Sequence, residues 1–540
     1  MRLFAYLLRQ TRGLVVVAVL AAIISGACSA LLIALINQQL TSPAALTART
    51  LALFGGVLLL VIATDLTAKG LLHRLILDIT HQLRLAVAWR ILRTPLRQLE
   101  IIGNPTLVSA LTEDIRTIAQ ALSYLPGLCL SLTILAACLI YLAWLSPLIF
   151  TLALAVALPT LLVYKQLQRL SQRSMSAHLA LRDQRDRHFA ALTQGAKELQ
   201  LSVLRRQAFW DHLLVPVLVE MRTQAMSARH YHAIAQSWSQ AAYFVLMLAI
   251  LALAWRVEIN LSLLISYAVT ALYMKNSLNQ ILPALPHLTE ATLALRKVEN
   301  LHLAADEEQA SVPDTSFAVH SHLCLTLSAV THAYTTDLSL EPFTLGPLDL
   351  HFSAGEVVFI TGANGSGKTT LLKILAGLYA PESGLITLDG TPITEKNRPH
   401  YREQCAVVFS DFYLFEQLLG LEETTINERA LTYLTKLQLH HKVTVEGGRL
   451  STLDLSHGQR KRLALLTAYL EDRPIYLFDE WAANQDPAFK ELFYRELLPE
   501  LADRGKLVIA ITHDDRYFAL ADRVLRLEAG RVVEETVSPV

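Results

Sequence analysis

Charged residues are scarce in this chain, and one long stretch has none at all. Asp, Glu, Lys and Arg make up 17% of the 540 residues, while apolar residues make up 53%. Soluble domains carry roughly 25% charged residues, so this composition excludes an ordinary soluble protein. Residues 117–164 contain no Asp, Glu, Lys or Arg. Because one helix of that length would be about 72 Å long and a bilayer core is about 30 Å thick, we predict that the stretch folds back at Ser146-Pro147.

Cysteine is also scarce, and neither sign of charge is in excess. The five cysteines are Cys28, Cys129, Cys138, Cys324 and Cys405. They show no paired spacing, so the sequence predicts neither a disulfide framework nor a cysteine metal site. Lys and Arg together number 47, as do Asp and Glu. This balance gives no support for a nucleic-acid partner, and we predict none.

Six membrane spans are predicted in the first half of the chain, each long enough to cross a hydrocarbon core. They lie at 14–36, at 51–72, twice within 117–164, at 233–255 and at 260–282. The second span contains Asp65 and Lys69, one helical turn apart, which are expected either to pair or to extend separately to the membrane surface. The last span contains Lys275, Asn276 and Asn279 on one broad helix face. That face would either line a central cavity and meet a substrate carboxylate, or belong to a helix that is leaving the membrane.

The distribution of basic residues predicts the orientation of these spans. With the N-terminus inside, segments 1–13, 73–116 and 165–231 are internal and hold 3, 6 and 11 Lys and Arg residues. The outer loops hold only Arg49 and Arg256. Because basic loops remain on the cytoplasmic side, both chain ends are predicted to be cytoplasmic.

Two internal segments, 73–116 and 165–235, are too long to be simple loops and keep helical periodicity. We predict that they are cytoplasmic extensions of the membrane helices. Each is interrupted once, at Gly103-Asn104-Pro105 and at Gln194-Gly195. Each break is either a plain helix end or the position of a short transverse helix that contacts a second domain.

The boundary of that second domain follows from a change in composition. Residues 304–320 are polar and lack periodicity, which predicts a linker. We therefore predict an α-helical six-span transmembrane domain at 1–303, fused to an α/β domain at 321–540.

A glycine-rich loop in the second domain predicts nucleotide binding. It follows the strand-like run 357–360 and leads into a helical pattern. Its glycines let backbone N–H groups point inward at phosphates, and the helix N-terminus favours anions. Lys368 is expected to reach the β- and γ-phosphates, and the Thr369 hydroxyl to ligate Mg²⁺. The predicted nucleotide-binding residues of this P-loop are Gly362, Ala363, Asn364, Gly365, Ser366, Gly367, Lys368, Thr369 and Thr370.

Three further segments predict hydrolysis of the bound nucleotide. An apolar strand ends in Asp479, expected to hold Mg²⁺, and Glu480, expected to orient and polarise the attacking water. The sequence Leu-Ser-His-Gly-Gln at 455–459 precedes a helix, so Ser456 offers another anion site. A further strand ends at His513, which is expected to contact the γ-phosphate and Glu480, although a lone strand-end histidine is more often a cap or a surface residue.

Together these motifs resemble the ATP-binding cassette superfamily over residues 323–535. The first 300 residues resemble the exporters of that superfamily in architecture alone. The resemblance implies ATP and Mg²⁺ as cofactors, and catalysis by Glu480 and His513. It also implies that each ATP is held between the P-loop of one subunit and the signature, residues 455–459, of another, so that a working unit needs a second copy of the chain. The further nucleotide contacts that it implies are Tyr334, Ser456, Gly458, Gln459 and Asp486.

Three positions depart from the usual pattern of the superfamily. Ser410 stands where a glutamine is usual, and the hydroxyl of its shorter side chain is predicted to bind Mg²⁺ or a water. His457 stands in the signature where glycine is commonest, and Trp481 follows Glu480 where a small residue is usual.

Several segments resemble the bacterial cyclic-peptide exporter subfamily: 478–482 with 485–487, 414–420 and 513–518 and, in the membrane half, 36–38 and 197–201. That group is associated with lasso-peptide microcins, lipopeptide toxins and peptide siderophores. The resemblance implies ATP-driven export of a cyclic or siderophore-like peptide by a homodimer in the bacterial inner membrane. Its partners would be the peptide or siderophore, membrane lipids and, as a further candidate, an outer-membrane channel.

The sequence leaves three alternatives open. The first is a siderophore importer built on the exporter architecture, and the second is a lipid flippase. The third is a membrane regulator that switches with ATP and moves no cargo. Glu480 argues against the third, because steady hydrolysis is more useful to a pump than to a scaffold.

Overall fold

The computed structural model describes residues 12–41, 47–257, 261–301, 303, 323–333, 343–421, 423–483 and 485–537. The predicted linker at 304–320 and Tyr334 lie outside these residues. The chain forms two compact units, one made of residues 1–92 with 104–303 and the other of residues 93–103 with 304–540.

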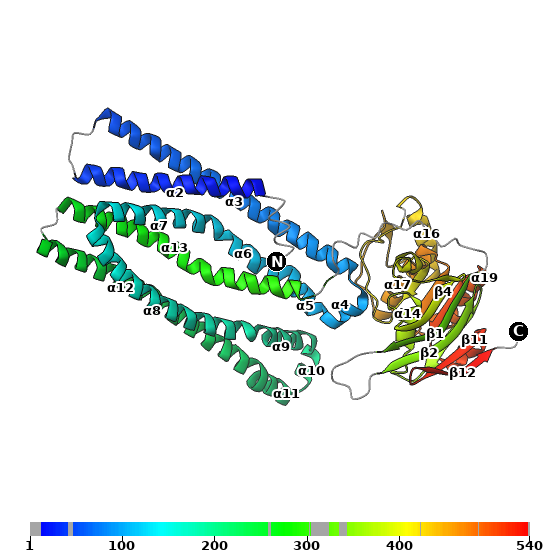
Figure 1. The fold of residues 1–540 in the computed structure, drawn as a ribbon. Coiled ribbons are helices and arrows are strands. Elements are labelled where there is room, and N and C mark those ends of the chain that lie inside the picture. Colours follow the sequence, from blue (N-terminus) through cyan, green and yellow to red (C-terminus); the bar gives the residue numbers. More distant parts are fainter. Residues whose placement is uncertain are drawn as a thin grey trace. The chain divides into compact units, whose positions relative to one another are not determined.

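The first unit consists of long helices, several of which run alongside one another (Figure 1). In chain order they are α2 (Arg12–Thr41), α3 (Ala48–Arg93), α5 (Asn104–Ser109), η1 (Ala110–Asp114), α6 (Ile115–Ser123), α7 (Leu125–Leu145), α8 (Pro147–Ala180), α9 (Arg182–Gln194), α10 (Ala196–Leu201), α11 (Val203–Ala208), η2 (Phe209–Leu214), α12 (Val215–Val257) and α13 (Leu261–Glu299). Helices α8 and α12 pack as one pair, and α7 contacts both α2 and α13.

The predicted fold-back in the uncharged stretch is confirmed. Helix α7 ends at Leu145 and α8 begins at Pro147, with Ser146 extended between them. The Ser146 hydroxyl caps α8 by accepting a hydrogen bond from the Ile149 N–H, and proline is well suited to the first turn because it has no N–H to satisfy. The Tyr267 hydroxyl donates to the Ser146 carbonyl oxygen at 2.8 Å, which ties this turn to α13.

The two predicted breaks in the helical extensions each lie beside a short helix. Gly103, with a φ of 81° that favours glycine, ends α4 (Leu96–Ile102), a helix that belongs to the second unit. Gly195 separates α9 from α10. At both breaks a short helix is therefore present, and the breaks are not plain helix ends.

Five helical stretches of the described residues are long and apolar enough to cross a membrane, judged by length and composition. They are Val19–Gln39, Ala48–Arg93, Asn104–Leu145, Pro147–Gln194 and Val203–Leu253. The sixth predicted span lies in α13, which is not one of these five. In the second stretch, Lys69 Nζ lies 2.7 Å from Asp65 Oδ2, so of the two alternatives for these charges the paired one is present.

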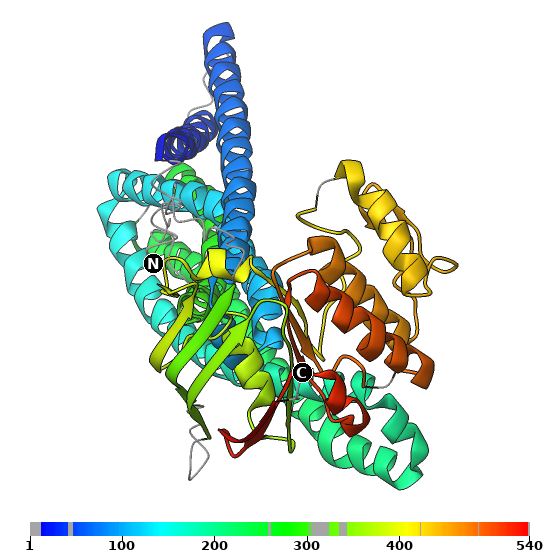
Figure 2. The same cartoon turned by 90° about the vertical axis from the view of Figure 1, so that its right-hand side faces the viewer.

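The second unit is built on two larger sheets, which are seen from another side in Figure 2. The four-stranded antiparallel sheet has the order β2-β1-β4-β5, with β1 (Cys324–Ala333), β2 (Thr344–Ser353), β4 (Ser383–Leu388) and β5 (Thr391–Pro392). The six-stranded sheet has the order β12-β11-β3-β10-β9-β6, with β3 (Val357–Gly362), β6 (Cys405–Val408), β9 (Ile475–Asp479), β10 (Leu507–Ile511), β11 (Arg523–Glu528) and β12 (Arg531–Val537). All its pairings are parallel except that of β12.

Helices and a small hairpin complete the second unit. They are α4, α14 (Lys368–Leu375), α15 (Arg398–Arg402), α16 (Glu423–Lys436), the hairpin β7 (Val445–Glu446) and β8 (Arg449–Leu450), α17 (His457–Glu471), α18 (Pro487–Leu492), η3 (Phe493–Leu497), α19 (Leu498–Asp503) and η4 (Asp515–Leu520).

Both faces of the six-stranded sheet are buried, as its runs of apolar residues require. Along β3, Phe359 faces the core that contains α16 and α17, whereas Val358 and Ile360 face the core that contains α14 and the four-stranded sheet. Because β3, β9 and β10 are parallel, their carboxyl ends meet at one edge of the sheet. The residues that follow each of these strands therefore come together there.

Candidate functional site

The P-loop has the backbone conformation that its glycines predict. Gly362, Gly365 and Gly367 have φ values of 141°, 81° and 102°, which residues with a side chain rarely adopt. A Cβ on Gly362 would lie 2.2 Å from the Leu527 carbonyl oxygen, so no larger residue fits there. Gly367 leads directly into Lys368, the first residue of α14, so the loop ends at a helix N-terminus.

Two polar groups inside the P-loop are suited to a phosphate ligand. The Lys368 ammonium donates to the carbonyl oxygens of Gly362 and Ala363 at 2.9 and 3.0 Å, which folds its side chain back over the loop. Burial lowers the pKa of Lys368, and the nearby carboxylates of Glu480 and Asp479 act in the opposite direction. The Ser366 hydroxyl is buried and has no hydrogen-bond partner among the residues that the structure describes. Since a buried hydroxyl is costly to leave unpaired, this atom fits a loop that closes on a ligand.

The three predicted metal ligands, Thr369, Ser410 and Asp479, lie together at the end of β9. Asp479 accepts hydrogen bonds from the Thr369 hydroxyl at 3.3 Å and from the Ser410 hydroxyl at 3.1 Å. Burial raises the pKa of Asp479, while the hydrogen bond from Ser410 lowers it in part. Carboxylate and hydroxyl oxygens are the donors that Mg²⁺ prefers. This donor set therefore fits Mg²⁺ held beside the P-loop.

Glu480 and His513, predicted from two separate strands, are in hydrogen-bond contact. His513 Nε2 lies 3.1 Å from Glu480 Oε1, and both side chains are partly exposed. The Glu480 backbone is left-handed, with a φ of 47°, and its N–H donates to the Ile511 carbonyl oxygen at 3.2 Å. A carboxylate in this position, next to Asp479, can accept a proton from a water.

The signature residues begin α17 and contact one another. The Ser456 hydroxyl accepts from the Gln459 N–H at 3.4 Å, and Gln459 Oε1 accepts from the Ser456 N–H at 3.2 Å, which forms a capping box. Gln485 Nε2 donates to the Gly458 carbonyl oxygen at 3.1 Å. Asp486 caps α18 and pairs with Arg462 of α17. Among the described residues, none of these predicted ligands forms a hydrogen bond with residues 362–369, so the signature of this chain is not in hydrogen-bond contact with its own P-loop.

The remaining predicted nucleotide ligands lie on the P-loop, in α14 or outside the described residues. Asn364 and Gly365 are exposed on the P-loop, and Thr370 is buried in the first turn of α14. Tyr334 lies outside the described residues, as noted above. His457, at the unusual position of the signature, is exposed, with its ring centroid 6.3 Å from that of Phe412.

Two groups of contacts were not predicted from the sequence. In the first, α4 packs against other elements of the second unit, where the Glu100 carboxylate accepts hydrogen bonds from Lys373 Nζ at 2.7 Å and from the Tyr379 hydroxyl. Arg97 of the same helix lies 3.2 Å from the Glu382 carboxylate. Lys373 belongs to α14, the helix that starts at the P-loop. A movement of α4 is therefore linked directly to the element that carries the phosphate site.

The second unpredicted group joins α17 to the residues after β9. Lys461 is 3% exposed, and its ammonium donates to the carbonyl oxygens of Glu480 and Ala483, each at 3.1 Å. The sequence did hold a signal for this residue. Positions 461, 464, 465 and 468 form the buried stripe of α17, and Lys461 is the one charged residue in that apolar pattern.

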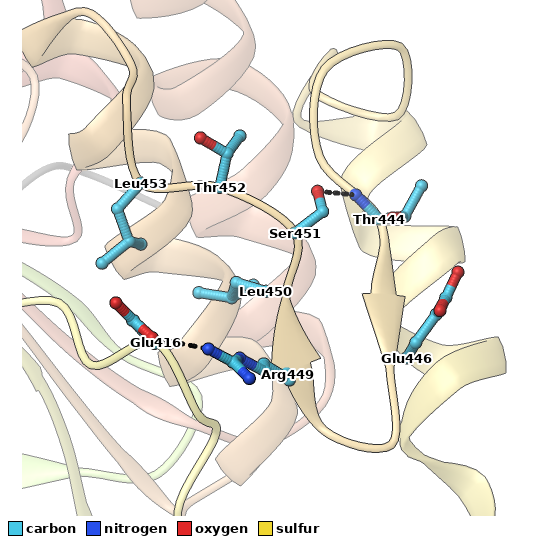
Figure 3. Close-up of a pocket in the computed structure, with 8 residues that line it drawn as sticks. All are labelled: Glu416, Thr444, Glu446, Arg449, Leu450, Ser451, Thr452 and Leu453. Atoms are coloured by element: carbon cyan, nitrogen blue, oxygen red, sulfur yellow. Dashed lines mark hydrogen bonds and ion pairs between the residues drawn. The ribbon is translucent and has the colours of Figure 1, made fainter.

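A cavity of about 400 Å³ lies beside the hairpin of β7 and β8, ahead of the signature (Figure 3). Arg449 projects toward Glu416 across it, with Nη2 and Oε2 3.0 Å apart. The Thr444 N–H donates to the Ser451 hydroxyl at 3.0 Å. Both partners of the ion pair are about 70% exposed, so it contributes little to stability, and the cavity carries none of the predicted ligands.

Comparison with known proteins places this geometry in one family. The family model described as "ABC transporter" matches residues 345–483. The ATP-binding protein SyrD of Pseudomonas syringae pv. syringae is 35% identical over 470 residues, which is 84% of this chain and 82% of that protein. The lactococcin-A transport/processing ATP-binding protein LcnC of Lactococcus lactis subsp. lactis is 26% identical over 51% of this chain and 39% of its own length.

The fold has a match along its whole length among solved structures. A bacterial Atm1-family ABC exporter with ATP bound superposes with a TM-score of 0.76, covering 99% of this chain and 96% of that one, at 17% identity. This likeness shows the fold, a helical part and a nucleotide-binding part of the exporter type. Taken with the long relative from Pseudomonas, it shows that the chain belongs to the ABC transporter family, as a multi-pass inner-membrane protein with the exporter fold that couples ATP hydrolysis in its cytoplasmic domain to transport.

Proposed function

We propose that two copies of this chain form a pump that exports a cyclic or siderophore-like peptide across the bacterial inner membrane. The need for a second copy is inferred from the lack of hydrogen bonds, among the described residues, between the signature and the P-loop of the same chain. Within the described part of the chain, Ser456, Gly458 and Gln459 make no hydrogen bond to residues 362–369. An anion site that starts a 15-residue helix and is not used by its own P-loop is available to the nucleotide of another copy.

The tip of the second helical extension supports the same conclusion. Leu201 is 84% exposed, Leu204 is 79% exposed and Val203 is 57% exposed, at the junction of α10 and α11. These three apolar side chains follow one another closely, and Trp210 and Leu213 of η2 are also exposed, at 57% and 46%. A second copy of the chain would cover them.

The roles we assign in hydrolysis follow from the contacts at the edge of the sheet. ATP would supply the bond whose hydrolysis drives transport, and Mg²⁺ would neutralise charge on its phosphates. Lys368 and the N–H groups of the P-loop would bind phosphate, while Thr369, Ser410 and Asp479 would hold the metal. Glu480 would accept the proton of the attacking water. His513 would hold the Glu480 carboxylate in place through their 3.1 Å contact.

A cavity in the helical unit supports a cargo that is largely apolar and carries an anionic group. It has a volume of about 370 Å³ and lies between α7, α8, α12 and α13. Lys275 is the one charged residue among those that line it, and its ammonium lies 5.4 Å from the centroid of the Tyr243 ring. No carboxylate among the described residues pairs with Lys275, so a substrate carboxylate could. Asn276 and Asn279, predicted on the same face, do not line this cavity.

The experiment that tests this proposal is ATP hydrolysis by the purified protein in lipid vesicles, with and without a panel of cyclic peptides. Wild type is compared with Glu480→Gln, which keeps the size of the side chain but removes the base. We expect peptides to stimulate hydrolysis and the substitution to abolish it, by about 10²-fold to 10³-fold. ATP binding by the variant should be unchanged, because Glu480 does not line the P-loop.

Other outcomes would change the assignment. Hydrolysis that no peptide stimulates, but that lipids do, would favour a flippase. Accumulation of peptide inside vesicles whose nucleotide-binding domains face inward would favour an importer. Full activity of Glu480→Gln would show that this glutamate is not the base.

A further inference from the structure

Lys461 is held in an environment that is unusual for a lysine. It lies on the buried face of α17, is 3% exposed, and forms no ion pair with any carboxylate in the described part of the chain. Its ammonium instead donates to two backbone carbonyl oxygens, those of Glu480 and Ala483, both at 3.1 Å. Burial lowers the pKa of Lys461, and the nearby carboxylates of Glu480 and Asp479 act to raise it. Burial of a charged group is unfavourable unless other groups compensate for its lost hydration, and here the compensating groups are two backbone carbonyls.

Trp481 returns a hydrogen bond to the same residue. Its indole N–H donates to the Lys461 carbonyl oxygen at 2.9 Å, and its side chain is 1% exposed. The indole packs against the rings of Phe493 and Phe489, with centroids 4.4 and 5.8 Å away. The Lys461 side chain thus bonds to the backbone around Trp481, and the Trp481 side chain bonds to the backbone of Lys461. We call this reciprocal pair the 461–481 clamp.

The clamp acts on a residue whose backbone is strained. Glu480 has a φ of 47°, a left-handed conformation that is unfavourable for a residue with a Cβ. Such a conformation persists only where neighbouring groups determine it. On one side the Glu480 N–H donates to the Ile511 carbonyl oxygen at 3.2 Å, and on the other the Glu480 carbonyl oxygen accepts from Lys461. The direction in which the Glu480 carboxylate leaves the chain therefore depends on both bonds.

The clamp also reaches the signature. Lys461 lies in the first turns of α17, whose N-cap is Ser456. Gln485, two residues after Ala483, donates to the Gly458 carbonyl oxygen at 3.1 Å, and Arg462 lies 3.2 Å from Gln485 Oε1. The start of α17 and the chain that follows Glu480 are thus joined by hydrogen bonds, and each segment supplies side chains to them.

We propose that Lys461 is a positioning residue for Glu480, and that the 461–481 clamp transmits the state of the signature to the base in the same chain. The second part rests on the proposed function, in which the signature contacts the nucleotide of the second copy. Nucleotide bound to one P-loop would then act through the partner chain's signature helix on the base of the other site. This gives the two sites a physical route for cooperative hydrolysis.

The test uses the full chain in lipid vesicles, with four single variants and one double variant that combines Lys461→Met with Trp481→Phe. Lys461→Met removes the donor and keeps the length of the side chain, and Lys461→Arg restores a donor. Trp481→Phe removes the indole N–H and keeps an aromatic ring. Lys396→Met, at an exposed lysine elsewhere in the second unit, is the control for the loss of a lysine. For each we would measure kcat, the Kd for ATP, the Hill coefficient for ATP and the melting temperature.

If Lys461 positions the base, Lys461→Met should lower kcat by between about tenfold and about a hundredfold, with little change in the Kd for ATP. Lys461→Arg should recover part of the rate, and the double variant with Trp481→Phe should be no slower than Lys461→Met alone, because both bonds belong to one clamp. The Hill coefficient should fall toward one in Lys461→Met and in Trp481→Phe. A purely structural role would instead lower the melting temperature and weaken ATP binding together.

Three results would overturn the proposal. The first is an unchanged kcat in Lys461→Met, and the second is a loss of rate that follows the Kd for ATP. If Lys461→Met does not fold, Trp481→Phe decides, and an unchanged rate and Hill coefficient in that variant would be the third. A wild-type protein that hydrolyses ATP without cooperativity would refute the link between the two sites, while the effect of Lys461→Met on kcat would still test the positioning of Glu480.

Discussion

Replacing Glu100 by alanine should weaken the packing of α4 within the second unit. Glu100 accepts charge-assisted hydrogen bonds from Lys373 and Tyr379. Such bonds contribute about 1.5–3 kcal/mol each when buried. Here the side chain of Glu100 is 40% exposed and that of Lys373 is 18% exposed, so solvent reduces the contribution. We expect the substitution to cost docking about 1–2 kcal/mol, which is a factor of roughly 5–30 in the docked population.

Hydrogen exchange of the peptide that spans residues 93–103 measures this directly. Amides of a short helix exchange through local opening, so their exchange should become faster by the same factor in Glu100→Ala. Ile101→Ala is the matched control, because Ile101 lies on the same helix and is 78% exposed. Its effect should stay within about 0.5 kcal/mol. Equal exchange in Glu100→Ala and in wild type would refute the docking argument, and equal acceleration in both variants would show that helix stability and not docking was changed.

The pH dependence of this contact follows from the direction of the Glu100 pKa. Burial acts to raise that pKa, but the hydrogen bonds from Lys373 and Tyr379 outweigh it and hold the pKa below its usual value. A carboxylate with a lowered pKa contributes fully at neutral pH, and its contribution disappears only as the pH falls through the lowered value. Docking of α4 should therefore be unchanged between pH 7.5 and about pH 5.5.

Two further predictions concern the metal and cargo sites. Burial raises the pKa of Asp479, so protons should begin to compete with Mg²⁺ for this carboxylate at a higher pH than for a free one. The Mg²⁺ concentration for half-maximal hydrolysis should therefore rise as the pH is lowered from 7.5 toward 5.5. Ser410→Ala should shift this rise to higher pH, because the Ser410 hydrogen bond lowers that pKa; unchanged Mg²⁺ titrations would exclude a role for Ser410. Lys275→Met should weaken stimulation by peptides that carry a carboxylate and leave basal hydrolysis unchanged, whereas Lys165→Met, an exposed lysine on α8 outside the cavity, should change neither. Equal loss of stimulation by amidated peptides would contradict the ion pair.

The parts of the site that were predictable are those that local sequence determines. The P-loop needs glycines at positive φ next to a helix start, and both requirements are met by neighbouring residues. Asp479 ends a buried strand, and Glu480 and His513 each follow one. Parallel pairing brings such strand ends to one edge whatever the lengths of the segments between them. The fold-back at Ser146-Pro147 was likewise predictable, because a helix longer than the bilayer has to be interrupted where a proline allows it.

Contacts between distant segments could not be obtained in the same way. Glu100 and Lys373 are 273 residues apart, and nothing in either local sequence identifies the other as its partner. Both residues look like ordinary surface charges in a helical pattern. Their pairing depends on α4 being packed with the second unit, although it follows helices of the first. Position in the sequence places residues 93–103 in the transmembrane domain, and it gives no sign of the contact between this segment and α14.

Lys461 is an intermediate case, because its local pattern is informative but its partners are not local. A charged residue at a core position of an otherwise apolar helix face has to find compensating polar groups, or the helix would not pack there. The sequence alone leaves carboxylates, backbone carbonyls and a bound ligand as equal candidates. Only the fold brings the carbonyl of a left-handed Glu480 within 3.1 Å of the ammonium. Since strain at a catalytic position has to be stabilised by its surroundings, the buried lysine and the strained glutamate explain each other.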